Sequence, residues 1–180
     1  MEKKSYKEAI NAYIQAIKYN EEDVESCYDL GLAYCYINQF PLAKKCFERV
    51  VSLDSSYSNA QYRLGQIALL YRDIENAEKY FLESIYGETE VKAYFQLAKI
   101  YMLKNNKDKA IMFINKAVYA DNKYYKIIDE EPIFLPIKNQ IIKDEHEENN
   151  TIEETPKEKQ ISEYLDNTYD LTKYLNNKDE

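Results

Sequence analysis

Hydrophobic residues recur every three or four positions along most of this chain, which is the spacing of one face of an α-helix. Short polar segments divide the recurring stretches, so the pattern predicts consecutive helices joined by tight connections. The expected helices lie at residues 5–19, 24–37, 40–53, 58–71, 74–86, 91–104 and 107–120. A further apolar face between residues 122 and 131 is compatible with one more helix. The chain is therefore predicted to be all-α.

One apolar pattern returns at a fixed spacing. Leu30-Gly31 comes back 34 residues later as Leu64-Gly65, and 33 residues after that as Leu97-Ala98. The same spacing relates three further sets of positions: Ala43, Ala77 and Ala110; Phe47, Phe81 and Ile114; Val50, Ser84 and Ala117. A period of this length is typical of helix pairs that bury their apolar faces by stacking on their neighbours.

These columns resemble the pattern of the tetratricopeptide repeat (TPR) family, which has Leu-Gly in its first helix and a small and a bulky residue in its second. The resemblance implies a right-handed superhelix of antiparallel helix pairs within residues 1–124, with full repeats at 24–57, 58–90 and 91–124. Ala9, Tyr13 and Ala16 continue the columns backwards, so residues 5–19 are expected to be an N-terminal half repeat. The nearest alternative, a 35-residue RNA-binding helical repeat, is disfavoured by the spacing of 34 and by the absence of a basic excess.

Residues beyond the repeats predict three further segments. Residues 125–143 are expected to cap the stack, with Pro136 preventing a regular helix. Residues 144–154 are a charged linker, and residues 155–176 are predicted to form an amphipathic helix with Pro156 at its first position. That helix is expected either to cover the apolar end of the stack or to lie in the groove of its own chain or of a neighbour.

Local signals place the ends of several helices. Ser5 and Glu8 have the spacing of a capping box that begins the first helix. Gly87 is expected to adopt a left-handed conformation just past a helix end. The connections within the helix pairs are expected at Asn38-Gln39, Arg72-Asp73 and Asn105-Asn106.

Charge divides the chain unevenly. Residues 1–125 hold 17 basic and 17 acidic side chains, whereas residues 126–180 hold 7 basic and 15 acidic side chains, which accounts for the net charge of −8. A neutral body with an acidic end argues against nucleic acid or an anionic membrane as partner. No signal core or membrane span is evident, so we expect a cytoplasmic protein in which Cys27, Cys35 and Cys46 are reduced, buried thiols.

Catalytic and metal-binding groups are not evident in the sequence. The single histidine, His146, lies within the acidic linker and is interpreted as a solvated residue. The cysteines lack the basic neighbours that would mark them as nucleophiles, and no glycine-rich phosphate loop is present. We therefore expect no enzyme activity, no cofactor and no metal.

The family resemblance implies that the first helix of each repeat lines a concave groove that binds a peptide or a partner helix. The groove positions in this sequence are Tyr28, Leu32, Cys35, Tyr36, Asn59, Tyr62, Arg63, Gln66, Leu70, Lys92, Phe95, Gln96, Lys99 and Leu103. Tyr28, Tyr62 and Phe95 occupy equivalent positions and form an aromatic column, which either contacts a partner or packs between helices. The Lys and Asn arrangement with which some family members clamp a C-terminal carboxylate is not met.

The expected function is therefore a protein-interaction scaffold or adaptor that binds a protein or peptide in its groove. One alternative is self-association through the N-terminal half repeat or the C-terminal helix. Another is a regulatory interaction domain of a larger signalling system.

Overall fold

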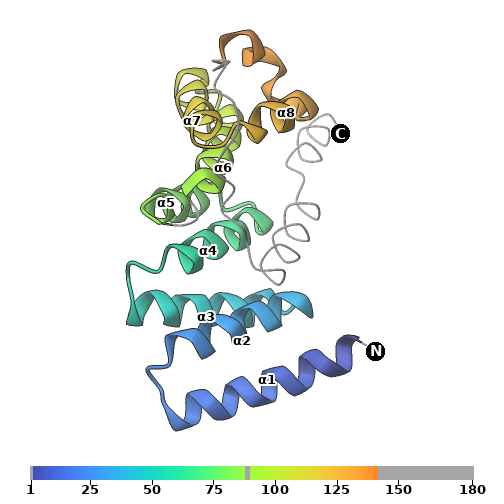
Figure 1. Cartoon of the computed structure of the whole chain (residues 1–180), viewed down its shortest axis with the longest axis vertical. Coiled ribbons are helices and arrows are strands. Elements are labelled where there is room, and N and C mark those ends of the chain that lie inside the picture. The colour runs from blue at the N-terminus through green and yellow to red at the C-terminus, as the bar shows by residue number, and fades with distance from the viewer. Residues whose placement is uncertain (1, 88–89, 142–180) are drawn as a thin grey trace.

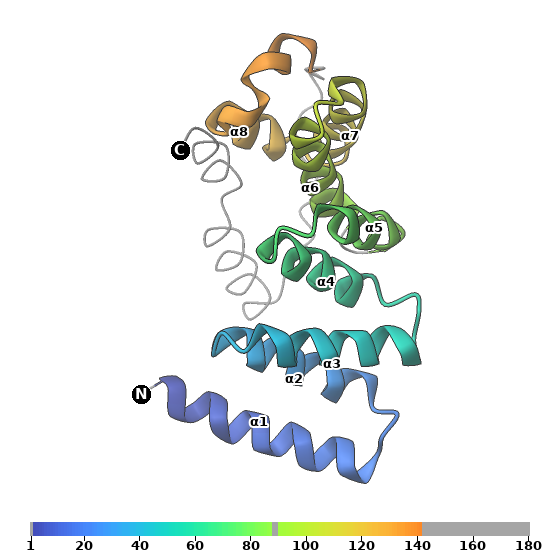
Figure 2. The same ribbon diagram turned by 180° about the vertical axis from the view of Figure 1, so that it is seen from behind.

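A computed structural model of the chain describes residues 2–87 and 90–141, and these residues contain helices and no strand. The elements in chain order are α1 (Glu2–Tyr19), α2 (Val24–Tyr36), α3 (Phe40–Leu53), α4 (Ser58–Leu70), α5 (Ile74–Ser84), α6 (Glu90–Leu103), α7 (Lys107–Ala120), α8 (Lys123–Glu130) and the 3₁₀ helix η1 (Pro132–Gln140). They stack in sequence, with α1 at one end and α8 at the other (Figures 1 and 2). The predicted all-α superhelix of paired helices is confirmed.

Glycine in the repeated Leu-Gly pair allows the two helices of a pair to approach closely. A Cβ atom at Gly31 would lie 2.6 Å from the Phe47 ring, and one at Gly65 would lie 2.7 Å from the Phe81 ring. Both rings are fully buried. In the third pair the equivalent positions hold Ala98 and Ile114, which are also fully buried.

Left-handed residues close the three helix pairs, but none of them is glycine. Asn38, Arg72 and Asn105 have φ values of 60°, 57° and 54°. After each of them, the next backbone N–H bonds to the carbonyl five residues earlier, at 2.8–2.9 Å, which satisfies the end of the preceding helix. The prediction that Gly87 is left-handed is wrong, because no described glycine has positive φ. Its lack of a side chain instead permits close approach to Ser58, whose hydroxyl oxygen would lie 2.2 Å from an added Cβ.

Two predicted helix boundaries differ from the structure by two or more residues. Helix α1 begins at Glu2, so Ser5 lies inside the helix and is not its N-cap; the preceding Glu and Lys residues favour helix and extend it. Helix α5 ends at Ser84, two residues early, because the chain turns so that Gly87 approaches α4. Pro136 lies within η1, which is a 3₁₀ helix and not the regular α-helix that an internal proline disfavours. The linker at 144–154 and the helix at 155–176 lie outside the described residues.

Helices α8 and η1 lie against the last full repeat. Phe134 and Ile137 of η1 have no exposed surface. The Phe95 ring of α6 packs against Tyr124 of α8 at 5.1 Å and against Phe134 at 5.7 Å between ring centroids. The apolar core therefore continues from α6 into these two elements.

Helix α1 is less fully covered than its counterparts in the later repeats. Ala9, Tyr13 and Ala16 are half-buried, although their equivalents Ala43, Phe47 and Val50 in α3 have no exposed surface. The described residues contain no helix that pairs with α1 from the N-terminal side.

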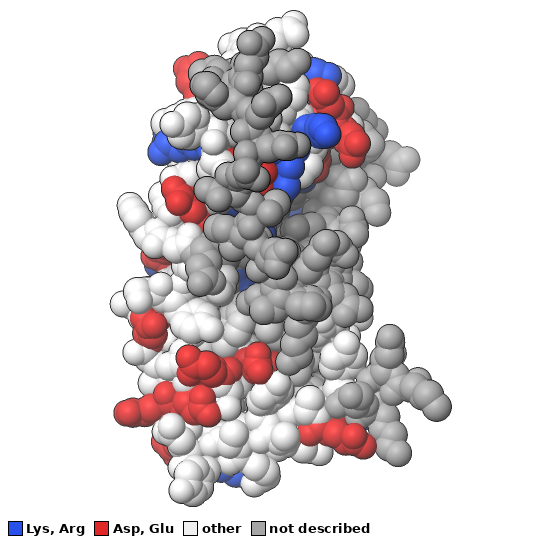
Figure 3. Space-filling model, in the orientation of Figure 1, with Lys and Arg blue, Asp and Glu red and all other residues white. Residues whose placement is uncertain are grey.

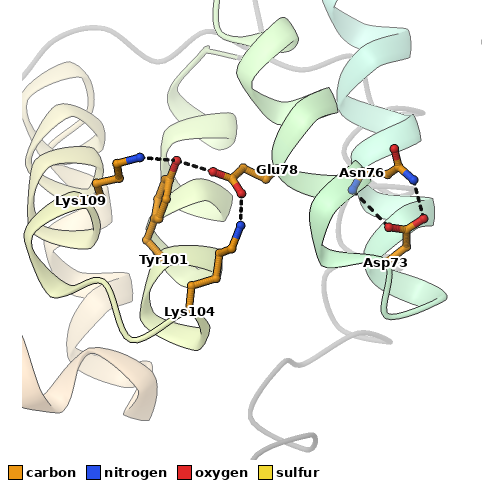
Figure 4. Close-up of polar contacts among 6 residues, drawn as sticks. All are labelled: Asp73, Asn76, Glu78, Tyr101, Lys104 and Lys109. Atoms are coloured by element: carbon orange, nitrogen blue, oxygen red, sulfur yellow. Dashed lines mark hydrogen bonds and ion pairs between the residues drawn. The ribbon is translucent and has the colours of Figure 1, made fainter.

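A polar cluster joins α5, α6 and α7 (Figure 4). The Glu78 carboxylate accepts hydrogen bonds from the Tyr101 hydroxyl and the Lys104 ammonium, and Lys109 Nζ donates to the Tyr101 hydroxyl at 3.4 Å. Burial opposes ionisation of Glu78, but the bonds from Lys104 and Tyr101 outweigh it and lower its pKa. Burial, together with the bond to Glu78, raises the pKa of Tyr101 to about 12. Figure 4 also shows Asp73 capping α5, with its carboxylate accepting from the Asn76 backbone N–H at 3.2 Å.

Candidate partner-binding site

Buried polar side chains are concentrated on two helices. Among the described residues, six polar or charged side chains are buried, and five of them belong to α4 and α6. These are Gln61, Arg63 and Gln66 on α4, and Gln96 and Lys99 on α6. Both are first helices of repeats, which the family resemblance assigns to the concave side. The second helices α3, α5 and α7 bury apolar residues and Ser84.

Charged side chains on the surface are distributed differently from the buried polar side chains. On the face shown in Figure 3, acidic side chains gather over the half of the stack that contains α1, and both signs of charge are mixed towards α8. No broad basic patch is visible among the described residues of that face.

Arg63 brings together predicted groove residues from two repeats. Its side chain is 4% exposed, and its Nη1 donates to Gln66 Oε1 at 3.1 Å. The guanidinium carbon lies 5.9 Å from the centre of the Tyr62 ring. On α2, the guanidinium also interacts electrostatically with Tyr28, Cys35 and Tyr36. We name this group the Arg63 cluster: Tyr28, Cys35, Tyr36, Tyr62, Arg63 and Gln66.

Arg63 carries its positive charge in this environment. Burial by itself would lower the pKa of the guanidinium, but neighbouring Tyr28 and Tyr62 more than offset this effect, and the pKa is raised. No carboxylate of the described residues forms an ion pair with Arg63, and its buried Nε has no hydrogen-bond partner among them. A buried charge without an opposite charge is unfavourable, so this site favours a carboxylate ligand.

Lys99 forms a second buried cationic site. Its side chain is 8% exposed, and its ammonium lies 2.9 Å from the Glu131 carboxylate and 5.3 Å from the centre of the Phe95 ring. Glu131 follows the last residue of α8 and ends that helix. The segment beyond the repeats therefore supplies the carboxylate that neutralises Lys99.

The aromatic column packs within the helix pairs. Ring centroids are 5.5 Å apart for Tyr28 and Phe47, and 5.4 Å apart for Tyr62 and Phe81. Phe95 contacts Phe134 instead, because the third pair has no aromatic residue at position 114. Helix packing, one of the two roles considered for these rings, is thus observed. Tyr28 and Tyr62 also border the Arg63 guanidinium.

The remaining predicted groove residues fall outside these two sites. Leu32 is buried in the apolar core beside Phe47, and Gln96 is buried on α6. The half-buried residues are Asn59, Leu70, Lys92 and Leu103. The sequence prediction missed Glu131 as the partner of Lys99, since the two residues are 32 positions apart and no pattern in the sequence pairs them.

The described residues show no alternative chemical site. They contain no group of three His, Cys, Asp or Glu side chains arranged to hold a metal ion. Burial raises the pKa of both Cys35 and Cys46 to about 12, which leaves them as thiols at neutral pH. Cys46 is half-buried rather than buried as predicted. None of the described helices combines the length and apolarity that crossing a membrane requires.

Comparison with known proteins gives consistent family matches. Sequence models of the TPR repeat match residues 1–35, and models of the tetratricopeptide repeat match residues 28–90 and 91–124. The matched regions together extend over the half repeat and the three full repeats expected from the sequence.

Curated relatives include the BBSome complex member BBS4. The Bos taurus protein is 27% identical over 124 residues, which are 68% of this chain and 24% of that protein. The Mus musculus protein is 30% identical over 80 residues, which are 44% of this chain and 15% of that protein. The chain thus spans about a quarter or less of the length of these relatives.

Solved structures share the fold. MamA superposes with a TM-score of 0.65 at 24% identity, over 75% of this chain and 78% of MamA. YrrB, described as a TPR protein with an unusual peptide-binding site, superposes with a TM-score of 0.57 at 19% identity, over 72% of this chain and 74% of YrrB. Repeat columns, stacked helix pairs and family matches agree, and the chain belongs to the tetratricopeptide repeat family, a family of protein-binding scaffolds.

Proposed function

We propose that this protein is an interaction scaffold that holds a peptide or a helix of a protein partner on the side formed by α2, α4 and α6. The observation that carries the proposal is the Arg63 cluster, a charged arginine surrounded by tyrosines with no carboxylate from the described residues. Arginine and tyrosine dominate binding hot spots, because they combine a large contact area with directed hydrogen bonds. A carboxylate on the partner would complete the site.

The relatives support a binding role. BBS4 is a member of a complex, and YrrB has a peptide-binding site. The buried, protonated thiols give no support to a catalytic role. We propose a cytoplasmic scaffold without enzyme activity, whose partners are proteins rather than nucleic acid or membrane.

Affinity capture with two matched variants tests this proposal. Arg63→Gln removes the buried charge, whereas Lys45→Gln removes an exposed charge from α3. Proteins retained by the wild-type chain and by Lys45→Gln, but lost with Arg63→Gln, would support the site. Equal capture by all three folded proteins, with folding checked by circular dichroism, would contradict it.

Self-association through α1 is a second candidate. Ala9, Tyr13 and Ala16 remain half-buried at positions that are fully covered in α3, which leaves apolar surface for another helix. Sedimentation at two concentrations tests this candidate. A concentration-dependent mass that Tyr13→Glu abolishes would support it, and a constant monomer mass would exclude it.

A further inference from the structure

A cavity lies between two consecutive repeats, and none of the residues of the Arg63 cluster lines it. It has a volume of about 450 Å³ and lies between α3 and α5, over α4. This volume is within the range of ligand-binding pockets, roughly 300–1,000 Å³. We propose that the cavity binds a tyrosine side chain of a protein partner. This second binding site does not depend on the Arg63 cluster, so either site can fail without the other.

The cavity arises at a position where the neighbouring repeats carry tyrosine. Ala68 lines it together with Leu64 and Ile67, and all three are buried residues of α4. The equivalent positions, 34 residues earlier and 33 residues later, hold Tyr34 and Tyr101. Tyr101 is 5% exposed, so the third repeat buries a ring at this position. The methyl group of Ala68 leaves the corresponding space open in the second repeat.

The equivalent space between α5 and α7 shows how a tyrosine ring fills it (Figure 4). The Tyr101 ring stacks on the Phe113 ring, with 5.4 Å between centroids and 2° between planes. Lys109 Nζ lies 4.8 Å from the centre of the Tyr101 ring, and the Tyr101 hydroxyl donates to the Glu78 carboxylate. The ring is thus held by stacking, and its hydroxyl is held by a charged group of α5.

The Ala68 cavity offers an aromatic ring and a charged group at the corresponding positions. Tyr80 of α5 corresponds to Phe113 and presents a half-buried ring for stacking. Lys44 of α3 corresponds to Glu78. A phenol hydroxyl both donates and accepts hydrogen bonds, so it can accept one from the Lys44 ammonium. A tyrosine is therefore a side chain whose ring and hydroxyl both find partners in the cavity.

The rim of the cavity suits a neutral group carried by a polypeptide. The Lys44 ammonium lies 3.7 Å from the Glu48 carboxylate. The Asp73 carboxylate accepts from the backbone N–H of Asn76 at 3.2 Å and from its side-chain amide at 2.6 Å. A charged occupant would compete with these contacts, whereas a phenol would not. Tyr71 also lines the cavity and is 57% exposed, so a polypeptide that carries the ring would cover more apolar surface than a free phenol.

NMR titration of the full chain with two small probes tests whether the cavity takes a ring. The probes are 4-methylphenol, which is the tyrosine side chain, and 4-methylcyclohexanol, which has a similar size and a hydroxyl but no aromatic ring. We expect 4-methylphenol to shift the methyl signals of Leu64, Ile67 and Ala68, with half-saturation at about 1 mM. We expect 4-methylcyclohexanol to bind about fivefold more weakly, because it cannot stack, and Tyr80→Leu to abolish this preference. Equal binding of the two probes to the wild type would overturn the proposal.

Ala68→Tyr fills the cavity from within and provides an independent test. We expect this variant to lose the 4-methylphenol shifts at Leu64 and Ile67. Its unfolding temperature should be no lower than that of the wild type, because the new ring takes the place that Tyr101 has in the next repeat. Ala120→Tyr, at the exposed end of α7, is the matched control and should keep the shifts. Shifts that persist in Ala68→Tyr, or an unfolding temperature below that of Ala120→Tyr, would overturn the proposal.

Two blocked peptides identify the source of the ring. One carries a single tyrosine between alanines, and the other carries leucine at the same place. We expect the tyrosine peptide to shift the same methyl signals as 4-methylphenol, and the leucine peptide to bind about fivefold more weakly. Binding of 4-methylphenol without binding of the tyrosine peptide would assign the cavity to free phenols and overturn the proposal. A concentration-dependent mass that Ala68→Tyr abolishes would assign the ring to a second copy and would also overturn it. Loss of partner capture in Arg63→Gln is measured separately, so the proposed function stands or falls on its own.

Discussion

Arg63 and Lys99 are two buried cations on neighbouring inner helices, and they differ in what surrounds them. Both side chains are less than 10% exposed, and both lie beside an aromatic ring. Lys99 is neutralised by Glu131, a residue of the described fold, whereas no described carboxylate pairs with Arg63. The comparison suggests two roles for a buried cation. A cation that pairs with a carboxylate of its own fold stabilises that fold, whereas a cation without such a carboxylate is available to bind a carboxylate of a partner.

The energetics of the two sites should differ accordingly. Removing one member of a buried ion pair costs about 3–5 kcal/mol, because the other charge is left without compensation. Replacing a whole buried ion pair by apolar side chains of similar volume is often about neutral or stabilising, because no uncompensated charge is left behind. Arg63 has no charged partner among the described residues, so Arg63→Met leaves none of their charges uncompensated. Substitutions around Lys99 are therefore expected to lower stability, and those at Arg63 to change binding.

The largest effect is expected from Phe134→Ala, which breaks the contact that brings Glu131 to Lys99. Phe134 is fully buried against Phe95, so the free energy of unfolding should fall by about 3–5 kcal/mol. Urea denaturation followed by circular dichroism measures this change. Leu135→Ala, at a neighbouring position that is 65% exposed, is the control and should leave the midpoint nearly unchanged. Equal losses in the two variants would contradict a packed cap.

Glu131→Gln should have the next largest effect, because it leaves Lys99 buried without a carboxylate. Since the Glu131 side chain is 22% exposed, solvent reduces the loss to about 2 kcal/mol. The double variant Lys99→Met with Glu131→Gln should recover most of this stability in the same urea titration. If the two substitutions instead added their losses, Lys99 would not depend on Glu131.

Glu78 provides a comparison in which the cation is more exposed, since the Lys104 side chain is 36% exposed. Glu78→Gln should lower the free energy of unfolding by about 1 kcal/mol at neutral pH through weaker bonds to Tyr101 and Lys104. Because the pKa of Glu78 is lowered in the fold, its contribution is present above the unfolded pKa and is lost as pH falls through the folded value. Tyr101, whose pKa is raised to about 12, contributes below its unfolded pKa and loses this contribution as pH rises towards 12. Thermal unfolding between pH 3 and pH 7 should therefore show a smaller acid loss for Glu78→Gln than for wild type, and parallel curves would exclude the Glu78 contribution.

Arg72→Gly should have the smallest effect, and it separates backbone strain from charge. Arg72 has a φ of 57°, a conformation that glycine adopts without strain. We expect a gain of about 0.5–1 kcal/mol in unfolding free energy, since relief of strain exceeds the added freedom of the unfolded chain. A matched Lys45→Gly substitution within α3 should lose about 1 kcal/mol. A loss at both positions would show that the Arg72 side chain contributes more than its backbone strain removes.

The fold was largely predictable from the sequence, because the repeated columns mark direct contacts between helices. The same contact occurs in two repeats: Gly31 lies against the Phe47 ring, and Gly65 lies against the Phe81 ring. Local conformations were less predictable. A left-handed backbone conformation falls on Arg72, a residue type that does not indicate one. At Gly87 a side chain is excluded because Ser58 lies close to its Cα, and not because the backbone is left-handed.

For the candidate site, the sequence predicts which helices carry it but not how their side chains group. Repeat position identified Tyr28, Tyr62 and Arg63 as neighbours of the concave side. Their grouping around a buried guanidinium depends on how α2 packs beside α4. The neutralisation of Lys99 depends on a contact with Glu131, 32 residues away, outside the repeat pattern.

The role of Arg63 is tested most directly by Arg63→Met, measured for stability and for partner capture in the same preparation. We predict that the free energy of unfolding changes by no more than about 1 kcal/mol, while capture of the protein partner is lost. A loss of stability of about 3 kcal/mol or more, with unchanged partner capture, would contradict the account and make Arg63 a structural residue like Lys99.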